Sequence, residues 1–190
     1  MNKRTRQKRV RIASDAIAQI KAKKLIPEHH GYCTIDSYTS YDTQLNQAIK
    51  ANSVRCEVCA LGSLLVADVI KNNHLTVGEA DACDFDQINS RLANIFDTKT
   101  LVILEYLYEH TNAGVLSDSL DYDCCYSGIT FTDKEIALYN YYSEILPEDP
   151  KDRLLILLQN IVRNDGEFII PRDVVRKHEK EYKKEMACRP

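Results

Sequence analysis

The sequence has no tryptophan and few residues that break regular structure, with six glycines and five prolines in 190 residues. This scarcity excludes collagen-like and low-complexity chains. Long apolar runs are also missing, since a stretch such as 154–158 is far shorter than the roughly 20 residues of a membrane-spanning helix. No apolar segment of signal-peptide length follows the basic start of the chain. We therefore expect no membrane contact, no export and a cytoplasmic location.

Complete catalytic and nucleotide-binding motifs are absent as well. The chain contains no P-loop, no GxGxxG or GxSxG sequence and no RNA-binding aromatic signature. Asp121-x-Asp123 resembles the start of a calcium-binding loop, but no Gly stands at the sixth position and Thr132 occupies the twelfth, where that loop needs Glu. The sequence therefore predicts neither a recognisable enzyme class nor an EF-hand.

The seven cysteines suggest disulfides only if the protein is secreted, and their number is odd. A chain of this length can bury a core without disulfides or a structural metal. Its hydrophobic fraction of 44% and charged fraction of 28% are those of an ordinary globular protein. We therefore expect one globular domain with reduced thiols and no cofactor, with zinc as the alternative discussed below.

Charge is distributed unevenly along the chain. Residues 1–11 contain six basic and no acidic side chains, and residues 172–190 contain seven basic and four acidic ones. Between them, 12 basic and 24 acidic side chains give the body a net charge of −12. Such a body repels nucleic acid, so phosphate binding would have to use the two ends.

Helical periodicity predicts the fold class. Apolar residues recur at spacings of three and four in several segments, among them 10–20, 85–95, 101–108, 136–145 and 154–161. We predict a mainly α fold, a single compact helical domain of seven or eight helices or a helix-dominated α+β domain with a short strand pair. The domain spans residues 12–171, preceded by a basic N-terminal arm (1–11) and followed by a charged C-terminal helix or tail (172–190).

Several residue patterns predict where individual elements begin and end. The first helix should run over about 5–24, with Pro27 ending it. Asp97 or Thr98, the capping box of Thr132 and Glu135, and Asp149-Pro150 are start signals, and Asn164-Asp165-Gly166 is a stop signal. Residues 29–35 are predicted as a loop or a short extended piece. Residues 111–131 are predicted as a long surface loop that contains Cys124-Cys125 and ends in a short extended piece at 129–131.

The segment from Cys56 to Ala67 is apolar at nearly every position, so we predict a central helix enclosed on most sides. In the interpretation that we favour, Cys56 and Cys59 are small buried residues of this helix. As a zinc half-site, the pair would need two more ligands, for which Cys33, His29, His30 and Cys83 are nearest in sequence. As a redox pair, it would normally follow a strand of a βαβ unit, which the pattern does not predict.

A further interpretation makes Cys59 a catalytic nucleophile near the amino end of the central helix. Unpaired N–H groups and the helix dipole there lower a thiol pKa, which favours attack on a carbonyl or phosphate ester. The base would be one of His29, His30, His74 or His110. The spacing alone does not select among them, because a cysteine and its histidine pair in space and not in sequence.

The basic arm and the tyrosines are candidate contact surfaces. Nucleic-acid phosphates could bind the arm through its six cations, namely Lys3, Arg4, Arg6, Lys8, Arg9 and Arg11. The ordinary alternative is a solvated terminus. Tyr139, Tyr141 and Tyr142 lie on one predicted helix, so we expect at least one to face solvent and to offer a protein contact.

Four segments together resemble a small, uncharacterised family found in phages and prophage-bearing bacteria. They are Cys56-Glu57-Val58-Cys59-Ala60-Leu61-Gly62, Ile26-Pro27 after the opening helix, Phe96-Asp97-Thr98, and the stretch from Arg153 through Asn160 and Asn164-Asp165-Gly166 to Ile169. The resemblance covers about residues 8–170. It implies an origin in mobile elements and a bacterial cytosol, and it implies no activity, ligand or catalytic residue.

These observations lead to a functional prediction with two alternatives. We predict a non-enzymatic accessory protein that binds a host or viral protein through its acidic helical body, because no catalytic motif is complete. The first alternative is a cysteine hydrolase or transferase with Cys59 as its nucleophile. The second is a nucleic-acid binder stabilised by zinc at Cys56 and Cys59, which would use the N-terminal arm.

Overall fold

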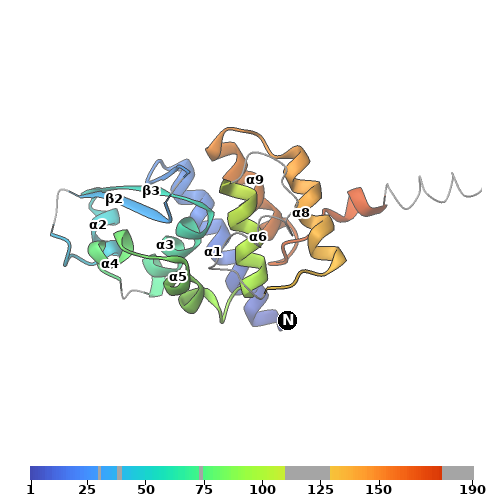
Figure 1. Cartoon of the computed structure of the whole chain (residues 1–190). Helices are drawn as coiled ribbons and strands as arrows, with labels where there is room; N and C mark the ends of the chain where they lie inside the picture. The colour runs from blue at the N-terminus through green and yellow to red at the C-terminus, as the bar shows by residue number, and fades with distance from the viewer. Residues whose placement is uncertain (30, 38–39, 73–74, 110–128, 177–190) are drawn as a thin grey trace, which may run out of the picture.

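The computed structural model describes residues 1–29, 31–37, 40–72, 75–109 and 129–176 (Figure 1). The prediction of a helix-dominated α+β fold is confirmed, because helices predominate in these residues and a small three-stranded sheet lies at one end. The elements are α1 (Lys3–Lys21), β1 (Leu25–Pro27), β2 (Cys33–Ser37), α2 (Leu45–Lys50), β3 (Val54–Val58), α3 (Ala60–Asn72), α4 (Val77–Asp81), α5 (Phe85–Leu92), α6 (Thr98–Glu109), α8 (Asp133–Ile145) and α9 (Pro150–Arg163).

Some predicted features lie outside the described residues or differ from them. Most of the predicted loop, with Asp121, Asp123 and Cys124-Cys125, and the tail beyond residue 176 are outside. Residues 129–131, predicted as extended, belong to no strand, and residues 172–176 are helical. Among the described residues, no helix combines the length and apolarity that crossing a bilayer requires.

Helix α3 is the centre of the core, as the sequence predicts. Every residue from Ala60 to Ala67 is buried, and α3 contacts α1, α2, α5 and α6. Helix α1 lies beside it and also packs along α9, so two helices far apart in the sequence are neighbours (Figure 1). The apolar stripes of these helices face one another, which is the usual source of stability for helices of this length.

The prediction of one helix over Cys56–Ala67 is wrong at its amino end. Residues 54–58 form β3, the middle strand of the sheet, which pairs in parallel with β1 and antiparallel with β2. Cys56 and Val58 point into the core, and Glu57 between them is half-buried. An enclosed strand followed directly by an enclosed helix reads as one uninterrupted apolar run, so periodicity alone does not separate the two.

The helix boundaries agree with the capping signals, except at the end of α1. Asp97 accepts the N–H of Thr100, Thr132 and Glu135 form a capping box, and Asp149 caps α9 with Pro150 behind it. Helix α1 ends at Lys21 instead of about residue 24, because Lys23 adopts a left-handed backbone conformation (φ 57°). The N–H groups of Lys23 and Lys24 then bond the carbonyls of Ile20 and Gln19, which closes the helix as a Schellman motif. Pro27, predicted to end the helix, lies in β1.

Candidate functional site

Cys59, the predicted nucleophile, immediately precedes α3 and acts as its cap. The Ser63 N–H donates to the Cys59 carbonyl (3.0 Å) and the Gly62 N–H points at its Sγ (3.5 Å). The residue is only 1% exposed, and burial raises the pKa of its thiol far more than the Gly62 hydrogen bond lowers it. The helix terminus therefore does not activate this thiol, and solvent has no access to it in this conformation.

The neighbour of Cys56 in β3 is Cys33 of the adjacent strand β2, not Cys59. Cys33 pairs with Val58 and Cys56 with Ile35, so both thiols are on the buried face of the sheet, diagonal to each other. A thiol–thiol hydrogen bond lowers the pKa of Cys56 and, together with burial, raises that of Cys33. The more acidic thiol of the pair is fully enclosed, which removes it from contact with a substrate.

Of the other predicted ligands and bases, Cys83 and His29 lie in the described part of the chain, and each has contacts of its own. Cys83 is half-buried and its thiol donates to the Glu79 carbonyl (3.1 Å). The Nδ1 of His29 lies 3.8 Å from the Glu109 carboxylate, and its ring centroid lies 5.0 Å from that of Tyr108. His30, His74 and His110 are outside the described residues. Within the residues that the structure describes, no group of three His, Cys, Asp or Glu side chains is placed to hold a metal ion.

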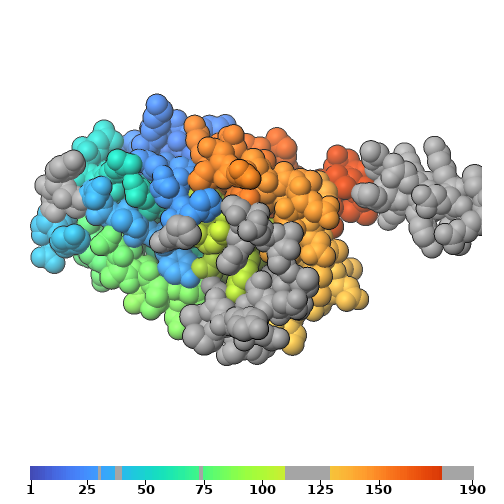
Figure 2. Space-filling view, turned by 45° about the horizontal axis from the view of Figure 1, so that its top comes forward, coloured from blue at the N-terminus to red at the C-terminus, as the bar shows by residue number. Residues whose placement is uncertain are grey.

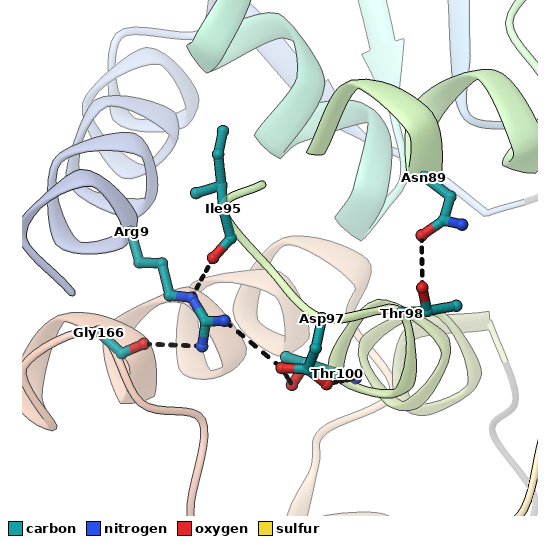
Figure 3. A network of polar contacts seen from close by, with 7 residues as sticks. All are labelled: Arg9, Asn89, Ile95, Asp97, Thr98, Thr100 and Gly166. Atoms are coloured by element: carbon teal, nitrogen blue, oxygen red, sulfur yellow. Dashed lines mark hydrogen bonds and ion pairs between the residues drawn. The ribbon is translucent and has the colours of Figure 1, made fainter. Parts of the chain in front are cut away.

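The basic residues of 1–11 are not a free arm, because residues 3–11 form the first half of α1. Arg9 is 9% exposed and donates to the carbonyls of Ile95 and Gly166 and to the Asp97 carboxylate (3.4 Å), as Figure 3 shows. Arg6 pairs with Glu167 (2.7 Å) and Lys8 with Asp68 (3.8 Å). Three of the six cations predicted to bind phosphate are thus engaged within the fold.

The tyrosines of α8 are mostly core residues. Tyr139 and Tyr142 are each 2% exposed, and Tyr141 is half-buried. We predicted that at least one of the three faces solvent; Tyr139 and Tyr142 do not, and Tyr141 is partly exposed. The rings of Tyr139 and Tyr142 pack in the core, where Tyr142 stacks on Phe168 with ring centroids 5.3 Å apart.

An apolar groove of about 600 Å³ lies beside these tyrosines, between α8 and residues 168–176. Ala137 and Leu138 of α8 form one wall, and the chain after α9 forms the other. Figure 2 shows the orange and red surface of these segments at the end of the molecule away from the sheet. The lining residues are Lys134, Glu135, Ala137, Leu138, Phe168, Ile169, Ile170, Arg172, Val175 and Arg176. Sequence reasoning missed the groove, although Phe168-Ile169-Ile170-Pro171 stands out as an apolar extended piece.

Asn160 of α9 fixes the second wall of the groove. Its amide nitrogen donates to the carbonyl of Ile169 (2.7 Å) and to the Tyr142 hydroxyl oxygen, and its amide oxygen accepts the Ile169 N–H (3.1 Å). Asn160 is 5% exposed, so these hydrogen bonds are protected from water. Both backbone groups of Ile169 are therefore hydrogen-bonded to a side chain of α9, which fixes this part of the groove wall.

Comparison of the chain with protein-family models, with curated proteins and with solved structures finds no match. The residues quoted for the phage-family resemblance have structural roles in this fold. Gly62 lets α3 approach the Tyr32 carbonyl, where a Cβ would lie 1.5 Å from that oxygen. Asp97 and Gly166 accept hydrogen bonds from Arg9, and Asn160 holds Ile169. The function must therefore be argued from the groove and the enclosed thiols.

Proposed function

We propose that this protein is a non-enzymatic accessory protein, encoded by a phage or prophage, that acts by binding a host or viral protein. The observation that carries the proposal is the groove between α8 and residues 168–176. Its volume of about 600 Å³ falls in the range of sites that hold a ligand or an anchoring side chain, and Leu138, Phe168 and Ile169 make it apolar. The phage origin rests on the resemblance in sequence.

The groove replaces the acidic body as the contact surface that we favour. Val175 is 40% exposed and Ala137 is exposed, so apolar surface reaches solvent at the groove. Apolar surface of this kind, rimmed by polar side chains, is typical of protein contact sites. An anchor residue of a partner would remove this surface from water, which is how a few residues come to dominate the free energy of association.

The two alternatives have less support from the described residues. A hydrolase or transferase using Cys59 would need a conformation that opens the core at the start of α3, because the thiol is 1% exposed. A zinc-stabilised nucleic-acid binder would need Cys56 and Cys59 to face one ion, while the Cys56 thiol lies on the buried face of β3 beside Cys33. Its arm would also have to release Arg6, Lys8 and Arg9 from their partners.

Affinity isolation with groove variants tests the proposal. Ala137→Trp fills the groove from an exposed helical position, and Ala18→Trp makes the same change on the exposed face of α1. We expect a stoichiometric partner from bacterial or phage-infected lysate with the wild-type chain and with Ala18→Trp, and a loss of more than tenfold with Ala137→Trp. Equal recovery with all three chains, or no stoichiometric partner, contradicts the proposal.

A further inference from the structure

We infer that the groove between α8 and residues 168–176 binds an acidic amphipathic segment of a partner protein, in which carboxylates flank large apolar side chains. The inference rests on the proposed protein-binding function and adds the chemistry of the partner. It is argued from the charge at the rim of the groove, from the floor of the groove and from the charge of the rest of the molecule.

The rim of the groove is basic. Lys134 lies at the start of α8, and Arg172 and Arg176 lie on the helical residues that close the other side. All three side chains are exposed, and none of them forms an ion pair with another residue in the described part of the chain. Three cations around an apolar floor present a surface that matches carboxylates.

The single acidic residue that lines the groove does not cancel this charge. The Glu135 carboxylate accepts the backbone N–H of Thr132 (2.7 Å) and its hydroxyl (2.8 Å), and it lies 3.7 Å from the Lys99 ammonium. It is thereby committed to the capping box that begins α8. Asp133 adjoins Lys134 in sequence and Asp173 adjoins Arg172, but neither aspartate lines the groove.

The basic rim of the groove differs in charge from the rest of the molecule, and this difference directs an acidic segment to the groove. Residues 12–171 carry a net charge of −12, so an acidic segment is repelled by most of the surface and attracted at the rim of the groove. The apolar floor, with Leu138, Phe168 and Ile170, then accepts the hydrophobic face of the same segment. A basic or uncharged segment would meet the floor without the attraction of the rim, so the groove selects against it.

Selection from a random peptide library tests the inference. The full-length protein is panned against displayed 15-residue peptides, in parallel with the triple variant Lys134→Glu, Arg172→Glu, Arg176→Glu. A matched control reverses three exposed cations outside the groove, Arg11, Lys50 and Arg91. We expect peptides rich in Asp or Glu beside Leu, Ile or Phe from the wild-type chain and the control, and a shift to Lys and Arg with the groove variant.

Affinity measurements give the magnitude. One exposed ion pair changes an affinity roughly 1.4- to fivefold, so losing three such pairs should weaken binding of the best peptide by roughly 3- to 125-fold. The affinity should also fall as salt rises from 50 to 300 mM, because the pairs are exposed. The inference is overturned if the selected peptides contain no more Asp and Glu than the input library. It is also overturned if the Ala137→Trp variant binds these peptides as tightly as the wild type does.

Other occupants give distinguishable results. A dimer in analytical ultracentrifugation that Ala137→Trp dissociates would identify a second copy of the chain as the occupant and overturn the inference. Displacement of the peptide by decanoate at equal concentration would indicate a small amphipathic anion in its place. If lysate partners depend on Ala137 while the selected peptides lack acidic residues, the partner chemistry fails and the proposed function stands. If neither partner nor peptide depends on Ala137, both fail.

Discussion

Arg9 should contribute strongly to the stability of this fold. Its guanidinium joins three segments that are far apart in sequence, since it leaves α1 and reaches Ile95, Asp97 and Gly166 (Figure 3). It also lies over the ring of Phe96, with 5.1 Å between Cζ and the ring centroid. Arg9→Met keeps most of the aliphatic stem and removes all of the donors, so it isolates the polar contribution.

The magnitude follows from the burial of each acceptor. Ile95, whose carbonyl accepts from Arg9, is only 2% exposed. A buried hydrogen bond from a charged donor contributes about 1.5–3 kcal/mol to the free energy of unfolding. The contact with the Gly166 carbonyl is long at 3.5 Å, and the Asp97 side chain is 58% exposed, so together they add about 1 kcal/mol at most. We therefore expect Arg9→Met to lower the free energy of unfolding by about 3 kcal/mol, or the midpoint temperature by roughly 6–12 °C.

Urea and thermal unfolding followed by circular dichroism measure this difference. Arg4→Met is the matched control, because Arg4 is an exposed arginine of the same helix and its replacement should cost less than about 0.5 kcal/mol. Arg9→Lys should fall between them, since one ammonium cannot reach all of the acceptors. A loss below about 1 kcal/mol for Arg9→Met would refute the assignment of Arg9 as the link between α1, the turn before α6 and the end of α9.

Three further predictions concern the core and the thiols. Gly62→Ala should destabilise the fold by about 3 kcal/mol in urea unfolding, because the new Cβ would lie 1.5 Å from the Tyr32 carbonyl oxygen; a change within 1 kcal/mol would show that α3 moves freely. Burial raises the pKa of Tyr142 to about 12, so this phenol contributes stability that is present below pH 10 and lost as pH rises through 12. The pH at the midpoint of alkaline unfolding should be higher for Tyr142→Phe, because this variant has no phenol to ionise at that position. A titration of tyrosinate absorbance in which every tyrosine has an ordinary pKa would contradict this. Iodoacetamide should label Cys83 in the native protein and reach the three buried cysteines Cys33, Cys56 and Cys59 only on unfolding; rapid labelling of Cys59 would revive the enzyme alternative.

Local signals in the sequence predict the starts of α6, α8 and α9 and the end of α9. Asp97, Thr132 with Glu135, and Asp149-Pro150 each satisfy backbone N–H groups within three residues, so the pattern contains the whole interaction. The stop at Asn164-Asp165-Gly166 is local in the same way, with Asp165 and Gly166 in left-handed conformations. Features that depend on four consecutive residues can be predicted from those residues.

The sheet and the surroundings of the thiols depend on distant residues. The prediction of one helix through the CxxC segment failed there, whereas the favoured interpretation of Cys56 and Cys59 as buried residues is confirmed, since they are 0% and 1% exposed. Strand β3 pairs with β1 and β2, about 20 to 30 residues earlier, and its apolar residues continue directly into α3. Cys59 has the helix-terminal position that favours a reactive thiolate, yet neighbours from other elements enclose it and raise its pKa. A sequence pattern contains the dipole of the helix but not the burial that outweighs it.

The groove is the least predictable feature, because its lining comes from α8 and from the chain after α9. Of this lining, only the apolar run Phe168–Pro171 stands out in the sequence. Its placement depends on Asn160, an ordinary polar residue in sequence, which bonds both backbone groups of Ile169. The buried amide of Asn160 thus fixes the segment around Ile169 as one wall of the proposed binding site.

Site-specific photo-crosslinking from the groove tests the central claim most directly. A photoreactive phenylalanine analogue replaces Ala137 in the groove or, as a control, Ala18 on α1, and the protein is irradiated in bacterial cells during phage infection. The proposed function predicts one discrete adduct from position 137, absent from position 18 and reduced by Lys134→Glu with Arg172→Glu. No adduct from position 137, or the same adducts from both positions, would contradict the claim that the groove is where this protein meets its partner.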